Sequence, residues 1–357
     1  MKMKKILALA LAALMLLTAL TGCSKEQQPL VKEIAGVDPE TTILTINGTP
    51  VTAEMYYYWL TIICEDTAAY FTDGIEWDSI MYDNVTTAQH IENNILSTLI
   101  QYQVIDELEK EYDLLSDEEV QAYLDKVYAE NVEGFGGEQV FQESLDAAGV
   151  SWEYLKHLYA TQYAYTELQT RLYQAGGPLE IPDSQIQGYI DDNYGPANGI
   201  YSCKHILLKT TDDKRQPLDD ATIAEKKATA EALIAQLKEA EDPIALFDTL
   251  MAEHNEDAGE PAEGYTFGPG EMVDAFYNGT AALEVGQISG IVESPYGYHI
   301  ILRLEDNIPT VDDLREGYIL EEFSVLFGQR VEDAYVEFNK EVSRMGPKDY
   351  YTEYAAG

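Results

Sequence analysis

Two stretches of the chain nearly repeat each other: H-I-L-L-K at residues 205–209 and H-I-I-L-R at residues 299–303. Each starts with a histidine, continues with apolar, partly β-branched residues and is flanked by turn-forming residues, which predicts a buried strand. The stretches are too far apart for a hairpin, so we expect neighbouring strands that open and close one small domain. Such strands would place His205 and His299 side by side. The alternative is two unrelated core histidines, each with its own hydrogen-bond partner.

The residues between the two histidines follow the motif order of a known family. P-G-E-M-V-D-A-F occupies residues 269–276, V-G-Q-I-S-G-I-V residues 285–292, and Y-G-Y-H-I-I residues 296–301. Together with the opening H-I-L, these motifs resemble the parvulin-type peptidyl-prolyl isomerases in order and spacing. The resemblance implies a parvulin domain over residues 199–306, with a four-stranded antiparallel sheet, surrounding helices and no cofactor.

The resemblance also implies catalytic residues. His205 and His299 match the paired core histidines of the family, while Asp257 and Ser294 match a polar position and a hydroxyl position near them. We expect Asp257 to orient or polarise the target carbonyl and the histidine pair to control the protonation of that carboxylate. A purely structural role for the histidines stays open. A metal site is not expected, because no tight ligand motif such as H-E-x-x-H is present.

Met272 and Phe276 match the family's proline-binding positions and would offer an apolar cup to a pyrrolidine ring. Plain core packing is the alternative for both. The chain departs from the family just before them, because the usual glycine-rich G-G-D-L-G loop is P-A-E-G-Y at residues 261–265. A bulkier loop is expected to narrow the pocket.

The N-terminus has the features of a secretory leader. Three lysines precede an uncharged stretch at residues 6–20, which is short for a membrane span, and L-T-G-C at residues 20–23 resembles a bacterial lipobox. We therefore expect a lipoprotein signal peptide at residues 1–22, lipid on Cys23 and a polar tether at residues 23–39. An ordinary signal peptide with an incidental cysteine is the alternative. Cys64 and Cys203 lie in apolar patterns and are expected to be buried free thiols.

The chain is strongly acidic, with a formal net charge of −42. Removing Lys2, Lys4 and Lys5 with the leader takes it to −45, since no acidic residue precedes Cys23. This balance argues against binding to nucleic acid and against electrostatic docking onto anionic lipid, which need basic patches.

The remaining segments predict a second domain. Residues 40–198 contain one short strand near 43–46 and then helical patterns, with Thr52 as one N-cap and Ser116-x-x-Glu119 as a capping box. The stretch T-I-L-T-I-N-G-T-P-V-T-A-E-M at residues 42–55 is similar to the start of PrsA- and SurA-type foldases. Residues 307–357 predict a helix that packs back on this domain, because a lone helix is unstable. Residues 350–357 are expected to fray.

The sequence therefore predicts an α+β protein in which a parvulin domain is inserted in an all-helical, chaperone-like domain. The expected function is a foldase, lipid-anchored on the outer face of the cell membrane, that isomerises X-Pro bonds in unfolded or newly secreted polypeptides. A non-catalytic chaperone lipoprotein with a parvulin scaffold is the alternative, for which tyrosine-rich helices would supply the client surface. A solute-binding lipoprotein would need two βαβ-rich lobes, and that pattern is missing.

Overall fold

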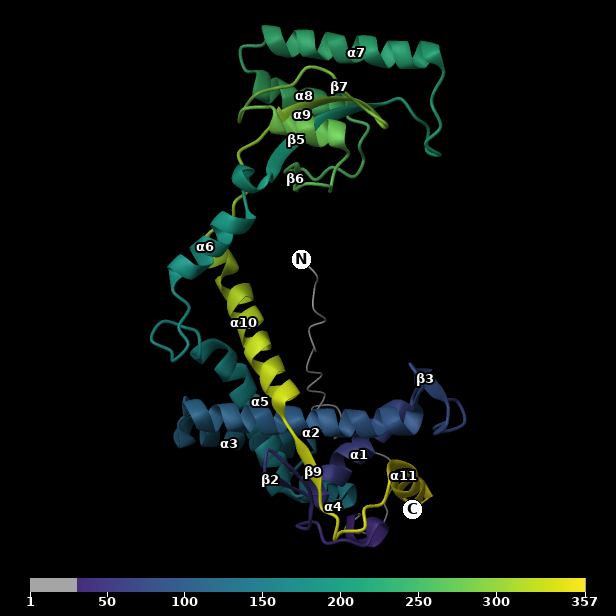
Figure 1. Ribbon diagram of the computed structural model, residues 1–357, viewed down its shortest axis with the longest axis vertical. Helices are drawn as coiled ribbons and strands as arrows, with labels where there is room; N and C mark the ends of the chain where they lie inside the picture. Colours follow the sequence, from purple (N-terminus) through teal and green to yellow (C-terminus); the bar gives the residue numbers. More distant parts are fainter. Residues whose placement is uncertain (1–30, 357) are drawn as a thin grey trace. The chain divides into compact units, whose positions relative to one another are not determined.

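The computed structural model describes residues 31–356 (Figure 1). The predicted signal peptide and the predicted lipid site at Cys23 lie outside the described residues. The described chain forms two compact units. The first comprises the residues up to Ile181 together with those from Gly317 onward, and the second is Pro182–Glu316.

The first unit is mainly helical. Its elements are η1 (Val31–Ala35), β1 (Thr42–Ile46), β2 (Thr49–Thr52), α1 (Ala53–Ala68), β3 (Ile80–Tyr82), β4 (Val85–Thr86), α2 (Thr87–Tyr112), α3 (Asp117–Gly134), α4 (Glu138–Ala148), α5 (Trp152–Arg171), most of α10 (Val311–Asp333), β9 (Val336–Phe338) and α11 (Pro347–Ala356). The predicted caps are confirmed: the Met55 N–H donates to the Thr52 hydroxyl, and Ser116 and Glu119 form a capping box.

A small sheet in this unit was not predicted. Strand β1 pairs on one side with β2 and on the other with β9, a segment that the sequence pattern had assigned to the C-terminal helix. The helix α10 ends at Asp333 because the following residues pair with β1: Leu44 faces Phe338, and the Asn47 N–H donates to the Tyr335 carbonyl at 3.0 Å. Tertiary pairing overrides the helical pattern here.

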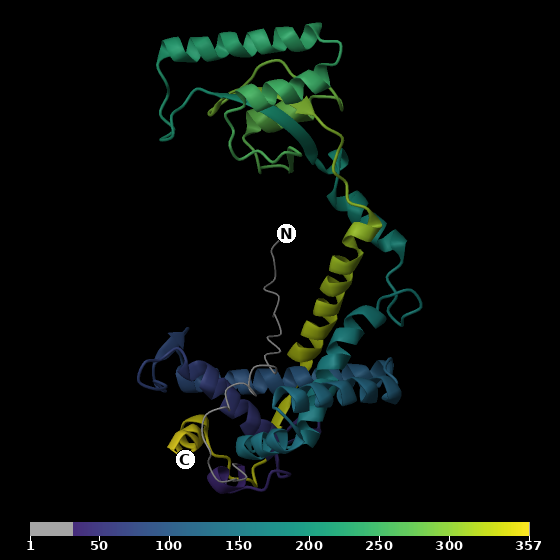
Figure 2. The same cartoon turned by 180° about the vertical axis from the view of Figure 1, so that it is seen from behind.

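The C-terminal residues are ordered, so the prediction that residues 350–357 fray is wrong for the described part. Helix α11 lies beside α1 and also contacts η1, at the start of the described residues (Figures 1 and 2). Tyr350 is only 1% exposed and stacks on Tyr57 with ring centroids 4.5 Å apart. The Met345 N–H donates to the Tyr57 hydroxyl at 2.9 Å. The buried aromatic ring holds the last helix in place.

The described part of the predicted tether also differs from expectation. Val31–Ala35 form one turn of π-helix, and Val31 is buried in the core of the first unit. Ile34, Ala35 and Val37 pack against the same core, and the polar composition of residues 23–39 concealed these apolar contacts.

The second unit contains the two histidine strands. Its elements are α6 (Asp183–Asn193), η2 (Pro196–Asn198), β5 (Tyr201–Lys209), α7 (Asp220–Glu239), α8 (Pro243–His254), β6 (Tyr265–Phe267), α9 (Asp274–Ala281), β7 (Val292–Ser294) and β8 (Gly297–Arg303). The strands form an antiparallel sheet in the order β6-β5-β8-β7, which confirms the predicted four-stranded sheet.

The register of β5 and β8 decides where the histidines lie. His205 faces Ile301 and His299 faces Leu207, so the two imidazoles are diagonal neighbours on one face of the sheet. Because side chains alternate along a strand, Ile206 and Ile300 point to the other face. That other face packs against α7 and α8, whereas the face of the histidines carries Phe276 of α9.

Candidate active site at the histidine pair

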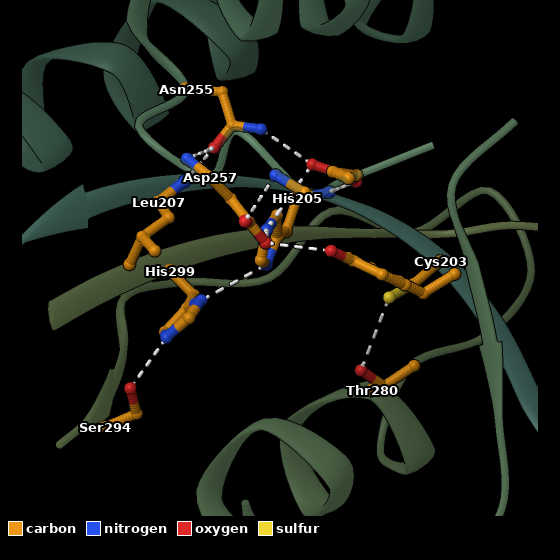
Figure 3. Close-up of polar contacts among 11 residues, drawn as sticks. Cys203, His205, Leu207, Asn255, Asp257, Thr280, Ser294 and His299 are labelled. Carbon is orange, nitrogen blue, oxygen red and sulfur yellow. Dashed lines mark hydrogen bonds and ion pairs between the residues drawn. The ribbon is translucent and has the colours of Figure 1, made fainter. Parts of the chain in front are cut away.

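The histidines form a buried, directly bonded pair, as predicted (Figure 3). The Nδ1 atoms of His205 and His299 are 3.2 Å apart, and the ring centroids are 5.1 Å apart. An isolated imidazole in this position would lose its hydrogen bonds to water, so the pairing satisfies one nitrogen of each ring.

Each remaining ring nitrogen has a polar partner at a predicted position. Nε2 of His299 is 2.7 Å from the Ser294 hydroxyl, and Nε2 of His205 is 3.1 Å from Oδ2 of Asp257. Figure 3 shows the four side chains in one row, with the histidines in the middle. The structure thus brings together all four residues that were predicted to be catalytic.

Burial keeps both imidazoles neutral. It lowers the pKa of His299 to about 3, and the neighbouring His205 adds to this shift. Burial also lowers the pKa of His205, against the opposing effect of Asp257. Burial alone would raise the pKa of Asp257, but hydrogen bonds from the Gly259 N–H, from Tyr265 and from His205 hold it below its usual value. At neutral pH the row therefore contains two neutral rings and one carboxylate.

The carboxylate sets the direction of every hydrogen bond in the row. Because an ionised Asp257 only accepts, Nε2 of His205 carries the proton and its Nδ1 is the acceptor. His299 must then donate from Nδ1 and accept at Nε2, where the Ser294 hydroxyl donates. The Tyr296 N–H donates to the same hydroxyl oxygen, which leaves the hydroxyl proton free for His299. The protons all point from Ser294 towards Asp257.

The two predicted proline-binding residues lie against this row. The ring of Phe276 is buried, with centroids 5.0 Å from His205 and 5.1 Å from His299. The half-buried Met272, just before α9, packs on the same cluster of Cys203, Phe267, Phe276 and Ile301. Phe276 is thus beneath the site and Met272 is nearer the surface.

Three polar residues of the site were not predicted. The Tyr265 hydroxyl donates to Oδ2 of Asp257 at 3.1 Å, and Asn255 and Glu260 bond to the backbone of β5. Tyr265 is the first residue of β6 and the last of the P-A-E-G-Y stretch that departs from the family's glycine-rich pattern, and that departure was the only signal for it. Gly264 holds this loop close to β5, because it has φ +87° and an added Cβ would be 2.4 Å from the Cys203 carbonyl oxygen.

Other sequence-based expectations concern cysteines, metals and membranes. Cys64 and Cys203 are buried free thiols, as predicted. Within residues 31–356, no three histidine, cysteine or acidic side chains are grouped to hold a metal ion. None of the helices described in this range is long and apolar enough to cross a bilayer.

Residues 205–305 match the family model described as "Rotamase: PPIC-type PPIASE domain". The Foldase protein PrsA of Geobacillus sp. is 31% identical over 166 residues, which cover 42% of this chain and 51% of that protein. The Foldase protein PrsA of Caldanaerobacter subterraneus subsp. tengcongensis is 23% identical over 329 residues, 89% of each chain. The Chaperone SurA of Nitrosospira multiformis is 31% identical over 115 residues, 32% of this chain and 24% of that protein.

These matches confirm the resemblance predicted from the histidine motifs. The family match covers both histidines and all the predicted catalytic and proline-binding positions. The chain spans about half the length of the first curated relatives that it matches.

Proposed function

We propose that this chain, which contains a parvulin domain of the PPIC-type PPIase family, is an extracytoplasmic foldase that isomerises X-Pro bonds in unfolded or newly secreted polypeptides. The observation that carries the proposal is the row from Ser294 through the neutral histidine pair to the ionised Asp257, with Phe276 beneath it. The PrsA and SurA relatives support the same class of activity.

The reaction requires a twisted amide and no bond cleavage. Rotation about a peptide bond crosses a barrier of roughly 18–20 kcal/mol, because resonance is lost when the amide is perpendicular. The cis and trans forms of an X-Pro bond differ by only about 1 kcal/mol, so both are populated and exchange slowly. A catalyst has to hold the proline ring, exclude the water that stabilises the planar amide and favour the twisted state.

The site offers a group for each task. Met272 and Phe276 provide an apolar surface for the pyrrolidine ring. Asp257 is a negative charge held by hydrogen bonds beside that surface, and it polarises or orients the amide carbonyl. The buried histidine pair fixes the position of Asp257 and cannot take up its charge, because both rings resist protonation. Acceleration of a proline-limited refolding reaction by the purified protein would support this function, and an unchanged refolding rate would contradict it.

The first unit supports a second activity, the binding of unfolded chains. Tyr56, Tyr57 and Tyr159 do not contribute to the client surface that the sequence suggested, because they are buried in the core. Exposed apolar side chains occur elsewhere, at Tyr70, which is 82% exposed, and along Ile80–Tyr82 of β3. Such a patch is suited to apolar segments of a client. If the site of the second unit proves inactive, a chaperone with a parvulin scaffold is the function that remains.

We expect the first unit alone, as residues 31–181 joined to 317–357 by a short linker, to suppress aggregation of an unfolded client. Serine at both Ile80 and Tyr82 should reduce this effect, because it removes apolar contact area without touching the core. Light scattering during client refolding measures the effect, with circular dichroism to verify folding. A folded protein that suppresses nothing would remove the support for a chaperone function.

The proposed location is the outer face of the cell membrane, through lipid on Cys23. Two acyl chains hold a protein firmly where one is marginal. We expect Cys23→Ala to move the protein from the membrane fraction to the soluble fraction, measured by fractionation and immunoblot. A variant that remains with the membrane to the wild-type extent would refute the anchor.

A further inference from the structure

One edge of β5 is bonded by side chains where the neighbouring strand ends. Strand β6 pairs only with Tyr201, Ser202 and Cys203. Beyond that point the backbone N–H groups of alternate residues donate to the loop that follows α8. His205 donates to Oε1 of Glu260 at 2.9 Å, and Leu207 donates to Oδ1 of Asn255 at 2.9 Å.

The same arrangement continues for one more step. Lys209 donates its N–H to Oε2 of Glu256 at 2.6 Å, and the Glu256 N–H returns a bond to the Leu207 carbonyl at 2.9 Å. Three side chains thus bond to the part of the β5 edge that β6 does not reach. We call them the side-chain ladder: Asn255, Glu256 and Glu260. The ladder attaches the segment that carries Asp257 to the strand that carries His205.

Glu260 is the member of the ladder that reaches the reactive groups. Its side chain is 1% exposed, and its Oε2 lies 3.4 Å from Nε2 of His205, the nitrogen that also bonds to Asp257. The same Oε2 accepts from the Asn255 amide at 2.7 Å. The Asn255 carbonyl oxygen in turn accepts the Asp257 N–H at 3.1 Å. One buried carboxyl therefore contacts His205 directly and Asp257 through a single side-chain amide, that of Asn255.

We propose that Glu260 is a positioning residue for the isomerase site: it joins His205 and Asp257 into one rigid group, and its charge determines whether Asp257 alone accepts the Nε2 proton of His205. The inference rests on the proposed isomerase function for its activity readout, but its structural readout does not depend on activity.

The charge of Glu260 is expected to change near neutral pH. Burial raises its pKa to about 7, against the hydrogen bonds from the His205 N–H and from Asn255; Asp257 adds to the rise and Lys204 opposes it. The other titratable groups that face the site change charge elsewhere. Burial lowers the pKa of His205 and that of His299, to about 3, hydrogen bonds lower that of Asp257, and burial raises those of Tyr265 and Cys203 to about 12.

Ionisation of Glu260 acts on the histidine pair through His205. An ionised Glu260 places a second carboxylate 3.4 Å from Nε2 of His205, where it competes with Asp257 for the single proton on that nitrogen. A His205 proton that is shared with Glu260 holds Asp257 less firmly, and Asp257 is the charge proposed to act on the amide carbonyl. Isomerase activity should therefore fall as the pH rises through about 7.

The test compares the pH profile of kcat/KM on an X-Pro peptide between the wild-type protein and Glu260→Gln. We expect the wild-type value to fall about ten-fold between pH 6 and pH 8, the factor that corresponds to one pKa unit of interaction, and the variant to be flat over this range. Glu256→Gln is the matched control, because it changes the next carboxyl of the ladder and should keep the wild-type midpoint. Superimposable profiles of wild type and Glu260→Gln would overturn the proposal.

A second readout uses the folded wild-type protein and does not require catalysis. The side-chain carboxyl carbon of Glu260, observed by 13C NMR, should titrate with a midpoint near pH 7, and the ring nitrogens of His205 should shift with the same midpoint. A Glu260 midpoint near the ordinary value of about 4.3 would refute the proposal. Chemical shifts of the His205 ring that do not follow the titration of Glu260 would refute it as well. A protein that does not catalyse exchange but has the coupled titration would refute the isomerase function and leave the role of Glu260 intact.

Discussion

Phe276→Ala should destabilise the second unit by about 3–5 kcal/mol, the range for removing a buried aromatic side chain. The ring packs against both histidines and against Phe267, whose centroid is 5.5 Å away. Its removal leaves a cavity beneath the histidine pair and takes away the apolar floor of the proline site. We therefore expect, at a temperature where the variant is still folded, a large rise in KM as well. Thermal melts and peptide kinetics measure the two effects.

Phe247 provides the matched control for this change. It is equally buried in the same unit, but it belongs to the core on the opposite face of the sheet, with Ile206 and Ile300. Phe247→Ala should cost a similar amount of stability and leave the KM of the folded protein close to wild type. Equal effects of both variants on KM would mean that Phe276 only packs the core.

Asp257→Asn should lower kcat by roughly 100-fold, the scale for removing one preorganised electrostatic contact, with little loss of stability. The amide keeps the shape of the carboxyl group but removes the charge that sets the direction of the histidine row. Asp257 is also partly exposed, so its substitution leaves no cavity. Exchange rates measured at saturating peptide, together with thermal melts, test both parts of the prediction.

Asp248→Asn removes a carboxyl charge from the same unit without touching the site. Asp248 is exposed and pairs with Lys204, and an exposed pair contributes about 1 kcal/mol or less. Its variant should retain the wild-type rate. A normal rate in Asp257→Asn would show that the negative charge has no part in the reaction.

Local patterns predicted the parts of the fold in which neighbours in sequence carry the signal. The apolar runs after His205 and His299 are strands, and Thr52 and Ser116 cap helices, because these features depend on a few adjacent residues. The pairing of β9 with β1 was missed, since only the folded first unit presents the free edge of β1 to residues 336–338.

In the site, too, residues that lie in recognisable sequence patterns were predicted, and residues whose role depends on the folded structure were not. The family resemblance identified the residues of the row and the cup: the histidines, Met272 and Phe276 lie within its motifs, and Asp257 and Ser294 match a polar and a hydroxyl position of the family. Glu260 and Asn255 have no such motif here, because their role comes from the point at which β6 stops pairing with β5. The register of β6 on β5 decides which backbone N–H groups of β5 remain free to bond to side chains. The sequence alone does not reveal this register.

The most direct test of the account is the cis–trans exchange of an X-Pro peptide, measured by NMR exchange spectroscopy with catalytic amounts of the purified wild-type protein. The proposed mechanism predicts exchange that accelerates in proportion to protein concentration, and that Asp257→Asn largely abolishes while Asp248→Asn does not. A wild-type protein that is folded by its thermal melt and yet leaves the exchange at the uncatalysed rate would contradict the central claim.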